Sequence, residues 1–102
     1  MRLSPAQRRL ILATIQELGD GDIDVRLFGS RLDENRRGGD LDLLLITSRH
    51  LSRMTLAVLK QALETRLFLP VDLVPYEVGS EPTPFQAIAL KQALPIETED
   101  AA

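Results

Sequence analysis

The spacing of apolar residues along the chain changes repeatedly between the period of a helix and that of a strand. Apolar side chains that recur every three or four positions predict an amphipathic helix, whereas alternating or short continuous apolar runs predict strands. We therefore expect helices at residues 5–18, 52–68 and 84–94, and strands at residues 23–28, 41–47 and 70–76.

This order predicts a small α/β (α+β) domain in which a mixed sheet of three to four strands is flanked by helices. The run from Leu41 to Thr47 is nearly continuously apolar, so both faces of this strand should be covered. The second helix has two apolar rows, and a stripe of that width predicts that both belong to the core. The rows are Met54, Val58 and Ala62, and Leu56, Leu59, Leu63 and Leu67.

Two short motifs mark the starts of helices. Ser4-Pro5-Ala6-Gln7 and Thr83-Pro84-Phe85-Gln86 each combine a hydroxyl residue, a proline directly after it and a glutamine three positions after it. This is the pattern of a capping box with proline in the first turn. It predicts that the first and last helices begin after these hydroxyl residues.

Length and charge limit what the chain can be. With 102 residues it should form a single domain over residues 1–96, followed by an acidic tail at residues 97–102 that we expect to be disordered. A net charge of -3 argues against a protein that coats DNA, because such proteins place many Lys and Arg on phosphates. We therefore do not expect nucleic acid as the partner.

The sequence contains no cysteine, which excludes a disulfide framework, a thiolate zinc site and a cysteine nucleophile. The basic start MRLSPAQRR precedes an apolar segment that Gln16, Glu17 and Gly19 interrupt, so no signal peptide is expected. No apolar stretch approaches the ~20 residues of a membrane span. We therefore expect a cytoplasmic location and no membrane partner.

Asp40 and Asp42 open the strand at residues 41–47, although aspartate is depleted in strands. Alternation places both carboxylates on one face, with their Cα atoms ~7 Å apart. Like charges this close repel unless a cation lies between them, and a divalent metal with oxygen ligands is the usual cation. The motif predicts that these two residues hold one or two Mg²⁺ ions, with Mn²⁺ as an alternative.

Gly29-Ser30 follows a strand and precedes a segment that can start a short helix. Glycine lets the backbone approach a ligand, and serine together with free N–H groups offers donors to phosphate oxygens. A plain turn is the alternative, since Gly-Ser is a common turn dipeptide. The loop that leads to Asp40 favours an anion-binding corner, because it contains basic and flexible residues: Arg31, Arg36, Arg37, Gly38 and Gly39.

Asp72 lies within the third strand. If that strand lies beside the strand at residues 41–47, its carboxylate can join Asp40 and Asp42 in a metal site of the two-metal type. Otherwise it is an edge-strand residue without a catalytic role, and the residues alone leave both interpretations open.

Two further polar features favour a structural interpretation. The acidic turn DGDID at residues 20–24 lacks the other ligands and the closing glutamate of a calcium-binding EF-hand loop. His50, the only histidine, lies in the link before the second helix, where we expect an exposed or capping role rather than general-base catalysis.

The pattern GS, nine residues, then DLD, with RLF before it and LLL after it, resembles the signature of the DNA polymerase beta-like nucleotidyltransferase superfamily. The short chain resembles the minimal nucleotidyltransferase branch, and the resemblance runs from the first helix to the last. It implies that Gly29, Ser30 and Arg31 bind the triphosphate. It also implies that Asp40 and Asp42 bind the metals and that Asp72, matched by its position in PVDLV, completes the site as the base for the acceptor hydroxyl.

The family resemblance implies transfer of a nucleoside monophosphate from ATP or another NTP to a hydroxyl, with release of pyrophosphate. Larger members of the family carry extra domains that hold the acceptor, and we expect none within these 102 residues, so the acceptor site would lie at a homo-oligomer interface or on a partner protein. Minimal members occur beside small helical HEPN-type proteins in toxin–antitoxin pairs, and the nucleotidyltransferase is thought to place AMP on a tyrosine of its partner. The resemblance thus implies an antitoxin with a HEPN-type partner.

Two other functions fit the same residues. The fold could neutralise a partner by contact, with nucleotide affinity but little turnover. Alternatively, the arginines between Ser30 and Asp40 could act on nucleic-acid phosphates, although the acidic composition and few aromatic residues disfavour this. Intact Asp40, Asp42 and Asp72 favour the enzyme, because polar groups buried without a task are costly.

Overall fold

A mixed four-stranded sheet with helices on both faces makes up the fold in the computed structural model, which describes residues 2–19, 21–32 and 40–97. The predicted fold class is confirmed. The elements are α1 (Pro5–Leu18), β1 (Ile23–Phe28), a 3₁₀ turn η1 (Gly29–Leu32), β2 (Leu41–Thr47), α2 (Arg53–Leu67), β3 (Val71–Glu77), α3 (Pro84–Gln92) and β4 (Leu94–Pro95).

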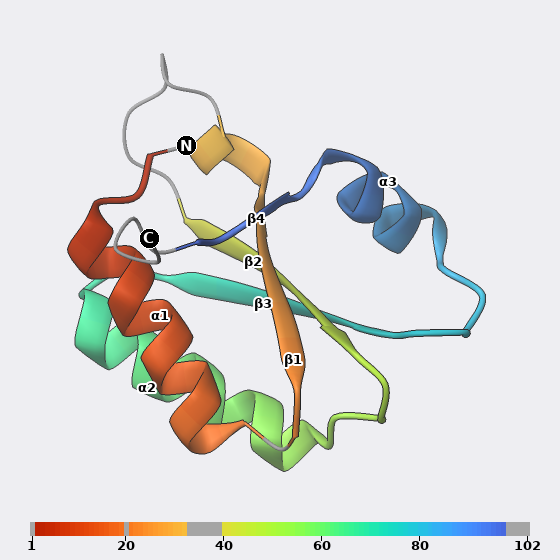
Figure 1. Cartoon of the computed structure of the whole chain (residues 1–102), viewed down its shortest axis with the longest axis horizontal. Coiled ribbons are helices and arrows are strands. Elements are labelled where there is room, and N and C mark those ends of the chain that lie inside the picture. Colours follow the sequence, from red (N-terminus) through yellow and green to blue (C-terminus); the bar gives the residue numbers. More distant parts are fainter. Residues whose placement is uncertain (1, 20, 33–39, 98–102) are drawn as a thin grey trace.

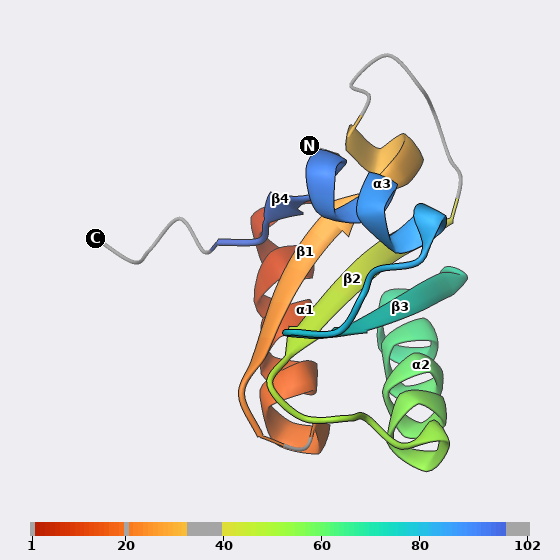
Figure 2. The same ribbon diagram turned by 90° about the vertical axis from the view of Figure 1, so that its right-hand side faces the viewer.

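The strands lie in the order β3-β2-β1-β4. β1 pairs antiparallel with β2 and with β4, whereas β2 pairs parallel with β3, and α2 is the crossover that a parallel pair requires. α1 and α2 lie on one side of the sheet and α3 on the other (Figure 1), and the turned view in Figure 2 shows the same arrangement. β3 is consequently an edge strand whose neighbour is β2.

Alternate residues of β2 enter two different cores, which explains its continuous apolar character. Leu43 and Leu45 belong to the larger core with side chains of α1 and α2, whereas Leu44 packs with Phe28 on the α3 side. All three leucines are fully buried. The prediction that both faces are covered is confirmed, and the same alternation places Asp42 on the α3 face of the sheet.

Both predicted capping boxes are present. Ser4 Oγ accepts from the backbone N–H of Gln7 at 3.1 Å, and the Gln7 side chain accepts from the Ser4 N–H at 2.9 Å. Thr83 and Gln86 repeat the pair at 3.1 and 2.9 Å. Gln86 Nε2 also donates to the carbonyl oxygen of Pro75 at 2.9 Å, which ties the start of α3 to β3.

The prediction that both apolar rows of α2 are buried is wrong. Met54 is 74% exposed and Val58 41%, whereas Leu59 and Leu63 are fully buried. The sheet covers only one side of the helix, so the row that contains Met54 and Val58 faces solvent.

The last helix is shorter than predicted. It ends at Gln92, and Leu94 instead pairs with Leu27 as the first residue of β4. Pro95 explains the difference, because a residue that precedes proline is pushed out of the helical conformation into an extended one. Ile96, directly after β4, is buried in the larger core.

Several predicted features lie outside the described residues. They are Asp20 of the acidic turn, the loop residues Arg36, Arg37, Gly38 and Gly39, and residues 98–102 of the tail. The division into a domain of residues 1–96 and an acidic tail stays a prediction. Within the described ranges, none of the helices has the length and apolar character that a membrane span needs.

Candidate functional site

Gly29 and Asp42 meet at the corner where the chain leaves β1. Phe28, the last residue of β1, is paired with Asp42, so the turn into η1 begins beside that carboxylate. Gly29 has a φ of 79°, in the left-handed region that favours glycine. A Cβ at this position would also lie 2.3 Å from Asp42 Oδ2. Glycine is required on both counts, and the backbone of the turn lies against the carboxylate.

The sequence predicts a short helical segment after Gly29-Ser30, and the structure has one, η1, which begins earlier, at Gly29, so that its backbone includes Ser30. The structure does not describe the Ser30 side chain. Arg31 is half-buried, and its Nη1 donates to the carbonyl oxygen of Arg2 at 3.3 Å. The Arg2 N–H donates in turn to the carbonyl oxygen of Arg31 at 2.7 Å. The turn is therefore fastened to the N-terminal segment.

The sheet brings Asp42 and Asp72 side by side. The two residues are direct partners in the parallel pair of β2 and β3, so both side chains leave the sheet on the α3 face. Asp42 is half-buried, whereas Asp72 is exposed. Asp40, which directly precedes β2, is also exposed.

The environment of Asp42 disfavours its charged form. Burial, followed by the negative charges of Asp72 and Asp40, raises the pKa of Asp42 above its ordinary value. Carboxylate oxygens are the ligands that Mg²⁺ and Mn²⁺ prefer, and a cation would relieve the repulsion at Asp42, so the donor set fits such an ion. In the described part of the chain, no group of three acidic, histidine or cysteine side chains is gathered closely enough to hold one metal ion. Shared coordination by all three acids stays a prediction.

Asp72 has a cationic neighbour that the sequence did not predict. Lys60 Nζ, on α2, lies 3.8 Å from Asp72 Oδ1 and 3.4 Å from Glu64 Oε2. The same ammonium donates to the carbonyl oxygen of Val71, whose N–H donates to Glu64 Oε2 at 2.9 Å. The Val71 N–H, and after it the Lys60 charge, hold the pKa of Glu64 below its ordinary value.

A partial signal for these contacts is present in the sequence. Lys60 and Glu64 are four positions apart on a helix, a spacing that predicts an ion pair. Lys60 and Glu64 also contact β3. This contact depends on the path of the chain between Leu67 and Val71, which the spacing of residues along the helix does not reveal.

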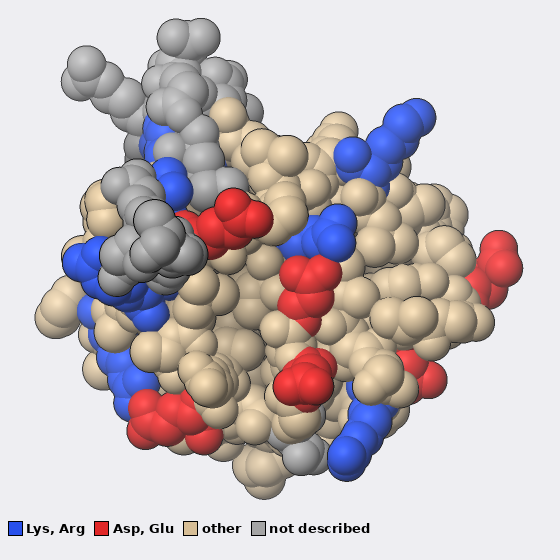
Figure 3. All heavy atoms as spheres, viewed as in Figure 1, with Lys and Arg blue, Asp and Glu red and all other residues tan. Residues whose placement is uncertain are grey.

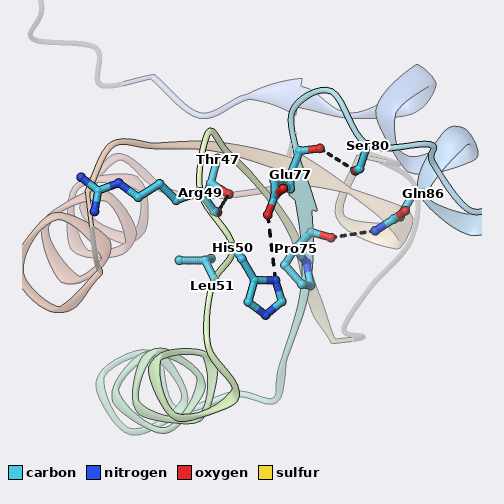
Figure 4. A pocket seen from close by; sticks show the side chains of 8 residues that line it. All are labelled: Thr47, Arg49, His50, Leu51, Pro75, Glu77, Ser80 and Gln86. Carbon is cyan, nitrogen blue, oxygen red and sulfur yellow. Dashed lines mark hydrogen bonds and ion pairs between the residues drawn. The ribbon is translucent and has the colours of Figure 1, made fainter.

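A cavity of about 270 Å³ lies at the opposite end of β2 and β3. Several of its polar groups are bonded within its own wall: Thr47 Oγ1 donates to the Arg49 carbonyl oxygen, and Ser80 Oγ to that of Glu77. Figure 4 shows the Arg49 side chain directed away and His50 facing Glu77. His50 is exposed, as predicted. Glu77 is the one carboxylate in the wall, which consists of Thr47, Arg49, His50, Leu51, Pro75, Glu77, Ser80 and Gln86.

Charges of both signs adjoin on the face shown in Figure 3. Basic side chains lie mainly on the α1 side of this face, with others at its centre and right, and acidic side chains are scattered from the α1 side to the right edge. Arg26 and Asp24, both on β1, form an ion pair of 2.9 Å. A nucleic-acid-binding protein is expected to present a continuous basic surface. The described part of this face has no such surface across the sheet.

Comparison with known proteins gives one family. The model of the nucleotidyltransferase domain matches residues 8–96. A solved structure of a protein proposed to be a minimal nucleotidyltransferase is 34% identical, with a TM-score of 0.65, and the match covers 88% of this chain and 89% of that chain. No protein with a curated description matches.

Two solved toxin–antitoxin complexes contain chains of similar fold. One is the tri-AMPylated HEPN toxin of Shewanella oneidensis with its MNT antitoxin, at 20% identity and a TM-score of 0.69 over 90% of this chain and 70% of that chain. The other is a toxin–antitoxin with AMP-PNP, at 21% identity and a TM-score of 0.72 over 96% of this chain and 76% of that chain. At these identities the likeness shows the fold alone.

Proposed function

The chain belongs to the nucleotidyltransferase domain family, and from this premise we propose that it is a metal-dependent enzyme that transfers AMP from ATP to a hydroxyl group of a partner protein. The observation that carries the proposal is the corner at which the Gly29 backbone lies against the Asp42 carboxylate, with Asp72 next to it on β3. Carboxylates held together by strand register repel one another, and a divalent cation removes that repulsion.

In the proposed reaction Asp40 and Asp42 hold Mg²⁺ or Mn²⁺, with Asp72 completing the site, and Gly29, Ser30 and Arg31 bind the triphosphate. The bound metal supplies charge neutralisation at the phosphates. The acceptor hydroxyl oxygen attacks the α-phosphorus, the bond from that phosphorus to the oxygen bridging to the β-phosphate breaks, and pyrophosphate leaves. Asp72 accepts the hydroxyl proton.

The acceptor we propose is a small helical protein of the HEPN type, with this chain as its antitoxin in the cytoplasm. Support comes from the S. oneidensis complex, in which a HEPN toxin is tri-AMPylated and an MNT antitoxin is bound. The AMP-PNP complex supports a nucleoside triphosphate as substrate. A homo-oligomer that completes the acceptor site is the alternative assembly.

The test is to incubate the protein with Mg²⁺, ATP labelled at the α-phosphate and candidate HEPN-type proteins, and to measure the intact mass of every species. We expect AMP on the partner and free pyrophosphate. The variant with both Asp40→Asn and Asp42→Asn should give neither. Label that appears equally with this variant would refute transfer at the proposed site.

A second candidate function is neutralisation of the partner by contact alone. The pairing of Asp72 with Lys60 favours it, because the third carboxylate already has a cationic partner. The same double variant separates the two functions: a contact inhibitor still protects cells from the partner when both acids are changed, whereas the enzyme does not.

A further inference from the structure

The outer edge of β3 is satisfied by α2 at one particular residue. An edge strand leaves N–H and C=O groups without a strand partner, and in a parallel strand successive residues direct these groups to opposite sides. Pro70 accepts from the Leu41 N–H at 3.0 Å, toward β2, so both backbone groups of Val71 face away from the sheet. The Glu64 carboxylate accepts from the Val71 N–H, and Lys60 donates to the Val71 carbonyl oxygen. The residue directly before Asp72 is thereby held at both polar groups.

Lys60 also reaches the Asp72 carboxylate. α2 packs on the sheet face opposite to α3, whereas the Asp72 side chain leaves on the α3 face. The ammonium therefore meets the carboxylate around the edge of β3, at 3.8 Å from Oδ1. Asp42 forms no ion pair with any residue that the structure describes. The two acids, which are neighbours on adjacent strands, therefore differ: Asp72 has a lysine beside it and Asp42 has no such cation among the described residues.

We propose that Lys60 is a positioning residue for Asp72: it holds the carboxylate at the sheet edge and competes with a divalent cation for it. Asp40 and Asp42 are then the principal metal ligands, and Asp72 is kept available to take the proton of the acceptor hydroxyl. This inference rests on the proposed function, since the position of Asp72 affects transfer only if the site is catalytic.

The competition has two consequences of opposite sign. Without the Lys60 charge, Asp72 is free to interact with the metal, so metal binding should tighten. Transfer should slow, because the carboxylate that accepts the proton is no longer held. If Lys60 merely fastens β3, its loss lowers stability and leaves metal binding unchanged or weaker.

The experiment measures Mn²⁺ binding without nucleotide, by the concentration of free Mn²⁺ in electron paramagnetic resonance, and transfer at saturating metal. Lys60→Met removes the charge at similar side-chain length, and Lys60→Arg keeps it. Lys91→Met is the matched control, because Lys91 is an exposed lysine of α3. For Lys60→Met we expect the half-saturating Mn²⁺ concentration to fall roughly three- to fivefold, as for an exposed ion pair, and transfer to slow about tenfold. Lys60→Arg and Lys91→Met should resemble the wild type.

Mn²⁺ binding by Lys60→Met that is equal to or weaker than that of the wild type overturns the proposal, as does a transfer rate of Lys60→Met equal to that of an active wild type. If the wild type transfers nothing while Lys60→Met still binds Mn²⁺ more tightly, the proposed function fails and the competition for Asp72 stands. Should Lys60→Met not fold, Lys60→Gln replaces it. This variant also removes the charge, and its amide can still donate to the Val71 carbonyl oxygen and so support the fold.

Discussion

The two ends of the β2–β3 pair are both polar, but they arrange charge in opposite ways. At the end with Thr47 and Glu77, hydroxyl groups donate to nearby carbonyl oxygens and His50 lies 4.0 Å from Glu77. At the other end Asp42 is half-buried next to two further acids, and its pKa is raised. Stability alone gives no reason to hold like charges together. The polar groups at the first end satisfy one another within a turn, whereas the acids at the other end repel, and the cation proposed for that site would relieve the repulsion.

The largest expected effect is on transfer. Asp42→Asn should reduce AMP transfer on the order of a thousandfold, because a metal ligand supplies several kcal/mol of transition-state stabilisation. Glu77→Gln, at the opposite end, should change the rate less than about twofold. Both rates come from the labelled-ATP assay, with folding checked by circular dichroism. Equal losses in the two variants would remove the distinction between the ends.

Gly29→Ala should be the most destabilising of the changes considered. It places a Cβ 2.3 Å from Asp42 Oδ2 at a φ of 79°, for a total loss of about 2–4 kcal/mol. Gly79→Ala is the matched control, since its φ is 93° but no atom lies within 4 Å of the new Cβ. It should lose only the backbone part, about 1–2 kcal/mol. Urea unfolding measures both, and equal losses would mean that the Asp42 carboxylate moves aside without cost.

Backbone strain at Phe68 should be removable without loss of transfer. Phe68 caps the C-terminal end of α2 with a φ of 59° and is 92% exposed, so it adopts the left-handed conformation without burying its ring. Phe68→Gly should stabilise the protein by about 1 kcal/mol and leave transfer unchanged. Phe68→Ala, which keeps the Cβ, should give no gain in thermal unfolding. A slower Phe68→Gly enzyme would mean that this turn contributes to the site.

The smallest effect is a pH dependence of stability in the metal-free protein. Because burial and neighbouring charges raise the pKa of Asp42, the folded state binds this proton more tightly than the unfolded chain, and the ionised group costs stability. This cost is complete above the raised pKa and disappears as the pH falls through it toward the ordinary value of 3.8. Asp42→Asn should therefore be more stable than the wild type at pH 7 and equal to it below 3.8. Urea unfolding in EDTA measures the free energy of unfolding of both proteins. If Asp42→Asn were more stable than the wild type by the same amount at every pH, the gain would come from packing and not from the charge.

Local spacing was sufficient to predict much of the fold. The alternation and apolar run at residues 41–47 depend on neighbouring positions only, as do the capping residues Ser4 and Thr83 and the glycine at the corner. The spacing of Asp40 and Asp42 likewise predicted which strand end carries the acids, although their roles stay predictions.

Features that depend on how distant elements meet were not predicted. The exposure of Met54 depends on how far the sheet extends beneath α2. The contact between Lys60 and Asp72 depends on the turn that joins α2 to β3. β4 has two residues, too few for any periodicity to reveal a strand.

This short strand affects how the protein can fold during synthesis. β1 is among the first elements to leave the ribosome, but one of its two neighbours in the sheet comes from Leu94 and Pro95, and Ile96 fills part of the larger core. Until these residues emerge, β1 has an open edge on the side where β4 will pair, and this edge is able to pair with other chains. Because contacts between distant residues form late, nascent chains stalled before residue 94 should be those most prone to aggregate.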